Sequence, residues 1–278
     1  MVLTAALARV RQILRIGAAF VRMGFLLEIS YPLAFILSQN QMFVPLFTYY
    51  FVDRLVETQG ASVGRDYFTF VVIAVCVTRV LVAALNDLSY ELDQVIQQGR
   101  LEMLLVEPIP WRYLPFGLVQ WPMIMRLCTM AVVVVASIPL GADYRLTGFP
   151  AALLVTLVGA AASLAIEMIA MSVKVISKRS DPILSLYSIA GNVLSGVFFP
   201  VTLLPGPFRV LSALLPQTYA IAGARAALMP AGADIPGTGV LGSILALTAF
   251  CAVLFPFALW LLGRSFESAR RIGVLAGY

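Results

Sequence analysis

The chain consists of long uncharged stretches separated by short segments that carry charge. The clearest stretches span residues 29–52, 146–166, 183–208 and 235–263. An apolar run of about 20 residues is long enough to cross the hydrocarbon core of a bilayer as a helix. In lipid only helices and closed barrels satisfy their backbone, and these stretches lack the alternation of polar and apolar residues of a barrel strand. The pattern therefore predicts membrane-spanning helices.

Followed from end to end, the pattern predicts an all-α polytopic membrane protein with six transmembrane helices. Polar or charged residues mark the ends of each helix, and all six belong to a single transmembrane domain over residues 1–278. The expected spans are residues 28–51, 67–88, 113–140, 148–173, a fifth that begins near residue 183, and 240–262.

Composition and charge agree with a lipid environment and suggest an orientation. Hydrophobic residues make up 61% of the 278 positions and charged residues 12%, whereas about a quarter of the residues of a soluble domain are charged. With the N-terminus inside, twelve arginines and lysines fall on the cytoplasmic side and five on the other. The positive-inside rule then predicts that both termini are cytoplasmic. No cleavable signal peptide is expected, because arginines interrupt the first apolar stretch.

The first 26 residues predict an amphipathic helix that lies on the cytoplasmic membrane surface. Arg11, Arg15 and Arg22 fall within about 40° of one another on a helical wheel, with apolar residues between them. In the alternative interpretation, these arginines only obey the positive-inside rule at the chain terminus.

The segment 196–229 predicts an external re-entrant helical hairpin between spans five and six. It remains apolar although it contains Pro200, Pro205, Pro207 and Pro216, a density that no straight helix tolerates. Broken backbone at membrane depth requires burial in protein or a wet cavity. An ordinary external loop packed on the bundle is the alternative. As external gate residues we expect Phe198, Phe199, Pro200, Pro205, Pro216 and Tyr219.

Three ionisable residues lie inside predicted spans, namely Arg79, Arg126 and Glu167. Such groups are costly in lipid and are candidates for function. Arg79 and Glu167 are predicted at similar depths, so that they could form an ion pair that fixes helix register. A polar path for a substrate is the other interpretation. We expect Cys76, Cys128 and Cys251 to be packing residues.

Two motifs resemble those of type-2 ABC transporter permeases, the drug and polysaccharide exporter class. Residues 98–109, read as Gln-Gly-Arg-Leu-Glu-Met-Leu-Leu-Val-Glu-Pro-Ile, are similar to that family's "G-x-L-E-x-L-L-x-x-P" segment. Residues 195–200, Leu204-Pro205, residues 215–220 and Arg225 are similar to its "SG-x-x-F-P … LP … P-x-T-Y … R" region. Gln217 departs from the pattern, where the family often has Leu.

The resemblance implies a membrane subunit of an exporter in the inner (cytoplasmic) membrane, paired with a second permease copy or a homologue. Two copies of a separate ABC ATPase would bind the ATP and Mg. The polar segment 89–112 would carry short amphipathic coupling helices that contact the ATPase; the alternative is a helix that only anchors the loop. The expected ATPase contacts are Gln98, Gly99, Arg100, Leu101, Glu102, Leu104, Leu105, Glu107 and Pro108.

Other functions find less support in the sequence. The chain has only two lysines, and neither Lys174 nor Lys178 belongs to a G-x-x-x-x-G-K-[ST] phosphate-binding loop. Histidine is lacking, no metal-ligand spacing or catalytic pair is visible, and we expect no enzyme activity, no bound cofactor or metal, and no nucleic-acid partner. A secondary, ion-coupled transporter is the main alternative, although Glu167 is the one clear membrane carboxylate.

Overall fold

The computed structural model describes residues 17–26, 28–30, 44–55, 66–97, 114–177, 181–229 and 239–272. Within these ranges the chain is helical and contains no strand, as the sequence predicts. Residues 17–26, 28–30 and 44–55 form the first helical segments, and α3 (Asp66–Gln97) follows. The remaining elements are α5 (Leu114–Ser137), η2 (Ile138–Leu140), η3 (Leu146–Gly148), α6 (Phe149–Ser177), α7 (Asp181–Leu194), η4 (Val201–Leu203), α8 (Gly206–Ala213), α9 (Pro216–Leu228) and α10 (Val240–Ile272).

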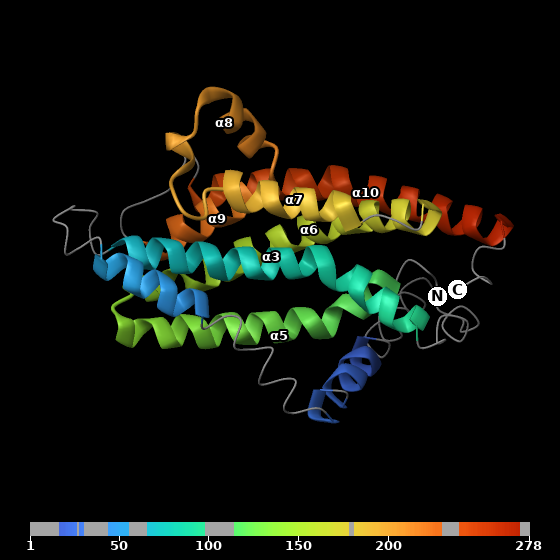
Figure 1. The fold of residues 1–278 in the computed structure, drawn as a ribbon, viewed down its shortest axis with the longest axis horizontal. Coiled ribbons are helices and arrows are strands. Elements are labelled where there is room, and N and C mark those ends of the chain that lie inside the picture. The colour runs from blue at the N-terminus through green and yellow to red at the C-terminus, as the bar shows by residue number, and fades with distance from the viewer. Residues whose placement is uncertain are drawn as a thin grey trace, which may run out of the picture.

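Four helices are long and apolar enough to cross a membrane. Their candidate spans are Tyr67–Glu91, Pro115–Leu140, Leu146–Lys174 and Val240–Ser265. These correspond to the second, third, fourth and sixth spans expected from the sequence. The long axes of α3, α5, α6 and α10 run side by side along the longest dimension of the molecule (Figure 1). The chain therefore has the architecture of a polytopic membrane protein.

The other two predicted spans are described only in part. Residues 44–55 form a helix at the end of the predicted first span, and residues 31–43 lie outside the described residues. In the region of the fifth span, the apolar helix Leu184–Leu194 is shorter than a full crossing. Of the predicted interfacial helix, residues 1–16 lie outside the described part, and residues 17–26 pack through Phe20 beside Gly117 of α5.

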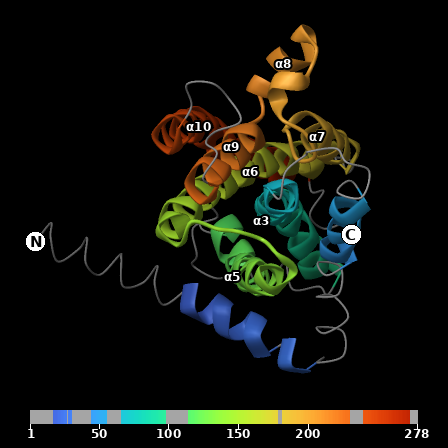
Figure 2. The same cartoon turned by 90° about the vertical axis from the view of Figure 1, so that its left-hand side faces the viewer.

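The helix α3 is the centre of the bundle. Seen along the bundle, it lies between α5, α6, α7, α9 and the helix of residues 44–55 (Figure 2). In its 18-residue apolar window 78% of the residues are buried, compared with 17% for α5 and 11% for α10. The residues of α3 are therefore positioned by protein on most sides, whereas α5 and α10 present most of their surface outward.

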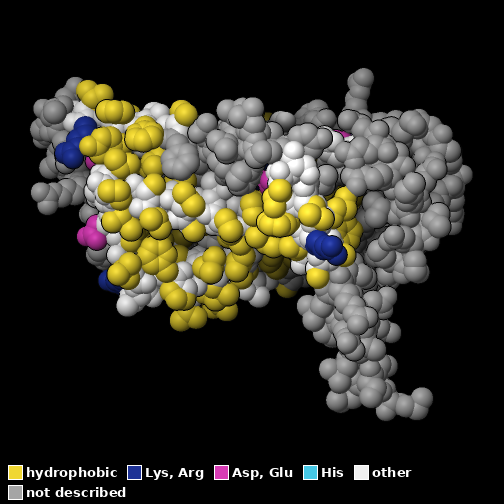
Figure 3. All heavy atoms as spheres, turned by 90° about the horizontal axis from the view of Figure 1, so that it is seen from below, with side chains coloured by type: hydrophobic (Ala, Val, Ile, Leu, Met, Phe, Trp, Pro, Cys, Tyr) yellow, Lys and Arg dark blue, Asp and Glu magenta, His cyan; other side chains and the backbone are white. Residues whose placement is uncertain are grey.

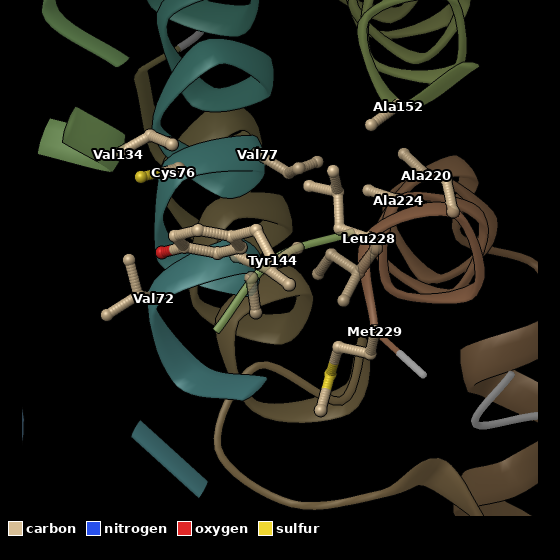
Figure 4. Close-up of a cluster of buried hydrophobic side chains, with 14 of the residues drawn as sticks. Val72, Cys76, Val77, Val134, Tyr144, Ala152, Ala220, Ala224, Leu228 and Met229 are labelled. Atoms are coloured by element: carbon tan, nitrogen blue, oxygen red, sulfur yellow. The ribbon is translucent and has the colours of Figure 1, made fainter. Parts of the chain in front are cut away.

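The main core joins α3 to α6 and α9. Val77 of α3 points toward Ala224 and Leu228 of α9, with Ala152 of α6 and Ala220 of α9 nearby, whereas Val72 and Cys76 lie on the other side of α3, Cys76 beside Val134 of α5 (Figure 4). Small residues at these contacts let the helices approach closely, as in other membrane bundles. A Cβ atom added at Gly159 of α6 would lie 2.8 Å from the Ala220 Cβ. Cys76 is buried, as expected of a packing residue, and Cys251 is half-buried, whereas Cys128 is exposed on α5 and is not the buried packing residue that the sequence predicted.

The outer surface of the bundle is apolar. Apolar side chains cover most of the described part of the face in Figure 3, and charged side chains are few there. Exposed positions on the long helices include Leu153, Leu154 and Leu157 of α6 and Val253 and Phe257 of α10. Such a large continuous apolar surface is typical of contact with lipid acyl chains.

Candidate functional site

A buried carboxylate on α6 accepts hydrogen bonds from the backbone of α3. The Glu167 side chain is fully buried and accepts hydrogen bonds from the backbone N–H of Ser89 (2.7 Å, to Oε1) and of Leu88 (3.3 Å, to Oε2). Both amides belong to the interior of α3, and a side chain inserted into a helical hydrogen-bond ladder is a common cause of a bend. The helix bends toward its C-terminal end (Figure 1). Glu167 therefore binds α3 near the point at which the C-terminal part of this helix bends.

Two ion pairs hold the same part of α3 from both sides. Lys174 of α6 donates to Asp93 Oδ2 over 2.6 Å, and Arg126 of α5 lies 3.8 Å from Asp87 Oδ1. Together with Glu167, these contacts tie residues 87–93 of α3 to its two neighbours. They lie just before the segment in which the ATPase contacts are expected.

The predicted coupling residues themselves lie outside the described part of the chain. Gln98, Gly99, Arg100, Leu101, Glu102, Leu104, Leu105, Glu107 and Pro108 all belong to residues 98–113. The structure does show that α3 continues to Gln97, nine residues beyond the predicted end of the second span. The polar residues from 89 onward thus extend the same helix, because the pair of Asp93 with Lys174 offsets the loss of apolar character.

At the other end of the bundle, a buried arginine binds the start of the region that resembles the exporter permeases, residues 195–225, which we call the motif region. Arg225 of α9 is fully buried, and its Nη1 and Nη2 donate to the carbonyls of Gly196 (2.8 Å) and Val197 (2.9 Å). Its Nε donates to the carbonyl of Phe70 in α3 (3.1 Å), and its guanidinium lies 3.2 Å from the centre of the Phe70 ring. Buried hydrogen bonds from a charged donor are strong and directional. Arg225 thus joins α9, α3 and the loop after α7.

The backbone of that loop needs glycine at one position. Gly196 has φ +81°, a left-handed conformation that glycine adopts without strain. The prolines expected in the external gate lie at the starts of short elements: Pro200 precedes η4, Pro205 precedes α8, and Pro216 is the first residue of α9. There the missing N–H of proline costs little.

The aromatic residues expected in the gate lie apart from one another. Phe198 is half-exposed and its ring centre is 5.9 Å from that of Tyr49 in the helix of residues 44–55. Tyr219 contacts Phe250 of α10 at 5.9 Å and donates to the carbonyl of Ala213 in α8. Phe199 is partly buried. The segment thus brings its aromatic residues to two different neighbours.

The structure does not bring Arg79 to Glu167. Arg79 is exposed on α3, whereas Glu167 binds the amides of Leu88 and Ser89 further along the same helix. In the described part of the chain no ion pair joins the two, so the pairing considered from the sequence is not formed. The acidic partner of a membrane arginine is instead Asp87, which pairs with Arg126. Asp87 lies one residue before the predicted end of span two. In the sequence it therefore resembles an ordinary charged residue at the end of a membrane helix, and its role as a partner of Arg126 was missed.

The connection between α5 and α6 packs at the same end of the bundle as Arg225 and is hydrogen-bonded to α9 and α3. The backbone N–H of Arg145 donates to the carbonyl of Leu228 at the end of α9 (2.8 Å), and that of Asp143 donates to Thr69 Oγ1 of α3 (3.1 Å). Tyr144 and Ser137 share a buried hydrogen bond of 2.7 Å, and burial raises the pKa of the Tyr144 phenol above its ordinary value. Sequence reasoning assigned only a short loop here, because backbone partners leave no sequence signal.

Comparison with known proteins does not identify the chain. No protein-family model matches it, and no curated protein matches its sequence. Within the described ranges, no group of three or more His, Cys, Asp or Glu side chains is placed to hold a metal ion.

Proposed function

We propose that the chain is the membrane-spanning permease subunit of an ATP-binding-cassette exporter. In this proposal it has six crossings and an external re-entrant hairpin, lies in the inner membrane with both termini cytoplasmic, and forms the translocation path with a second permease copy. Two separate ATPase subunits bind ATP and Mg and drive the path open and closed. The chain itself carries out no covalent chemistry.

One observation supports this proposal more than any other, namely the contact of Arg225 with Gly196 and Val197. These residues belong to separate parts of the region that resembles the exporter permeases, 28 and 29 positions apart in the chain. The Arg225 guanidinium binds the backbone at Gly196 and Val197, so the arginine at one end of this motif holds the loop at its other end. The same contact keeps the segment of α8 and α9 at one end of the bundle.

The geometry of α3 offers a route for force from the ATPase. In the proposal, residues 98–108 contact the ATPase, and in the sequence they follow directly on the helix that Glu167, Lys174 and Arg126 hold. A movement of this segment would be transmitted to α5 and α6 through those contacts. The ion-coupled alternative is less supported, because the Glu167 carboxylate on which it would depend is engaged by backbone amides of α3.

A charge reversal in the coupling segment tests the proposal. We expect Glu102→Arg to lower substrate-stimulated ATPase activity of the assembled complex without lowering membrane insertion, because the charged rim of the coupling helix sets its register on the ATPase. The control is Glu57→Arg, the same reversal in the predicted external loop. Unchanged stimulation in the Glu102→Arg complex would count against the coupling role.

A further inference from the structure

Between Tyr67 and Glu91, the exposed side chains of the central helix α3 lie along one line, and each of them carries a polar group. Between Tyr67 and Glu91 the exposed residues are Arg79, Asn86 and Tyr90, which we call the α3 polar stripe. Spacings of seven and four residues place them within about 40° of one another on a helix, over a length of about 16 Å. Within Tyr67–Glu91, the open face of the most enclosed span therefore carries polar groups along the half that runs from Arg79 onward.

Two of the other long helices, α6 and α10, differ from this face in their exposed residues, whereas α5 exposes Arg126 beside its partner Asp87. Exposed positions on α6 and α10 are mostly large and apolar, such as Leu153, Leu157, Leu245 and Phe257. An arginine in the middle of a span is costly in hydrocarbon, and such residues usually face the interior of a bundle or a water-filled cavity. The α3 polar stripe therefore belongs to a surface that is not covered by acyl chains.

The charge of Arg79 is not neutralised by an acidic residue of the described chain. The acids that follow it on and beside α3 are engaged elsewhere or lie far along the helix. Asp87 pairs with Arg126, Asp93 pairs with Lys174, and Glu167 accepts from Leu88 and Ser89. Glu91 lies about three helical turns from Arg79. Arg79 lies twelve residues from each end of the candidate span Tyr67–Glu91, which is about 18 Å along the helix. A ligand that matches this charge is therefore an anion held at mid-membrane depth.

The stripe is continued toward the motif region by aromatic side chains. Tyr49 is close enough to Arg79 for the two to interact electrostatically, and its ring lies 5.9 Å from that of Phe198. Phe198 belongs to the loop that Arg225 holds through the carbonyls of Gly196 and Val197. A row of neighbouring side chains thus runs from the middle of the bundle toward its proposed external end, and it consists of Arg79, Tyr49 and Phe198.

We propose that the α3 polar stripe binds the anionic head group of a transported amphiphile, with Arg79 as the residue that binds a phosphate or carboxylate. A guanidinium matches either group with two parallel hydrogen bonds, while Asn86 and Tyr90 offer polar partners along the path. The apolar part of the amphiphile would remain against the apolar surfaces beside the stripe. This inference rests on the proposed exporter function, which it extends by naming the class of substrate.

Binding of a defined amphiphile tests the proposal. The full chain is reconstituted in phosphatidylcholine nanodiscs, and dodecyl phosphate is titrated against dodecyltrimethylammonium, which has the same tail and the opposite charge. We expect saturable binding of dodecyl phosphate, weakened about tenfold or more by Arg79→Gln and less by Arg79→Lys. The control is Arg126→Gln, which removes another arginine of a long helix, one that pairs with Asp87, and should stay within about twofold of the native chain. Equal binding by native and Arg79→Gln chains, or equal binding of both amphiphiles, would overturn the proposal.

A second measurement distinguishes a ligand site from a surface covered by another copy of the chain. In a variant without Cys76, Cys128 and Cys251, Asn86→Cys should react with a water-soluble maleimide, and dodecyl phosphate should protect it. Failure to react, or reaction that the amphiphile does not slow, would contradict the stripe as a binding site. Neither measurement involves an ATPase. Their failure is therefore distinguishable from failure of the proposed function, which would appear as the lack of an ATPase partner.

Discussion

At the scale of single residues, the most consequential contact is the one between Glu167 and the backbone of α3. The carboxylate accepts hydrogen bonds from two buried backbone amides of this helix. A carboxylate at this depth is tolerated because both of its oxygens have hydrogen-bond donors. The residue therefore has a structural role in positioning the second half of α3, and the same contact makes α3 depend on α6.

This role predicts an order of stabilities. Glu167→Gln keeps one acceptor oxygen and should destabilise the folded chain by about 1–3 kcal/mol, whereas Glu167→Leu removes both acceptor oxygens from the two buried amides and should cost more. Lys174→Gln removes a partly exposed ion pair and should cost at most about 1 kcal/mol. Thermal unfolding of the purified chain in detergent gives the order. A Glu167→Leu chain as stable as the native one would show that α3 restores its own hydrogen bonds.

The sequence identified the membrane-embedded ionisable residues but not their partners. Arg79, Arg126 and Glu167 stand out because charge is rare in the spans, and the structure places all three on long helices. Glu167 binds backbone amides, which carry no residue-specific signal, and Asp87 resembles an ordinary charge at a helix end. The complete burial of Arg225 could not be predicted from the sequence, because its main acceptors are backbone carbonyls.

At the scale of elements, the close approach of α9 to the start of α6 depends on glycine. A Cβ atom added at Gly148 would overlap the carbonyl oxygen of Ala227, so the two backbones would have to separate. Gly206, at the start of α8, has no heavy atom within 4 Å of the corresponding position. The two glycines therefore form a matched pair for substitution.

We expect Gly148→Ala to destabilise the chain by about 1–3 kcal/mol, the usual cost of overpacking, and Gly206→Ala to leave stability nearly unchanged. Thermal unfolding in detergent compares the two variants directly. If Gly148→Ala unfolds at the same temperature as the native chain, the packing of α9 on the start of α6 is not as tight as described here.

The long helices could be predicted from the sequence because length and hydropathy alone mark them. Four of the six expected spans are helices of the required length, and their boundaries agree within a few residues except at the ends of α3 and α10. Both ends extend into polar sequence, where tertiary contacts or helix propensity outweigh the loss of apolar character. The short helices η4 and α8 were not resolved from the sequence, because closely spaced prolines indicate broken backbone but not its course.

At the scale of the whole molecule, the orientation of the bundle follows from where its connections lie. The α5–α6 connection, α8 and α9 lie at one end, and α3 and α10 finish at the other (Figure 1). In the proposed topology, the first of these ends is external and the second cytoplasmic. The segment of α8 and α9 then returns to the side from which it started.

Cysteine labelling in intact cells tests this topology in a chain without its native cysteines. Ala213→Cys in α8 and Gly239→Cys just before α10 should both react with a membrane-impermeant maleimide added outside, because both positions are exposed at the same end. Ser177→Cys at the end of α6 should react only after the cells are opened. Reaction of Ala213→Cys and Gly239→Cys from opposite sides would mean that the segment between them crosses the membrane.

The central claim, that this chain is a permease driven by a separate ATPase, is tested most directly by purification of its native complex. The tagged chain is extracted from its own membrane in a mild detergent, and the proteins that remain bound are identified and quantified by mass spectrometry. We predict a stoichiometric partner that contains the G-x-x-x-x-G-K-[ST] loop missing from this chain, in a complex that hydrolyses ATP. A folded, monodisperse chain that purifies without an ATPase would contradict the account.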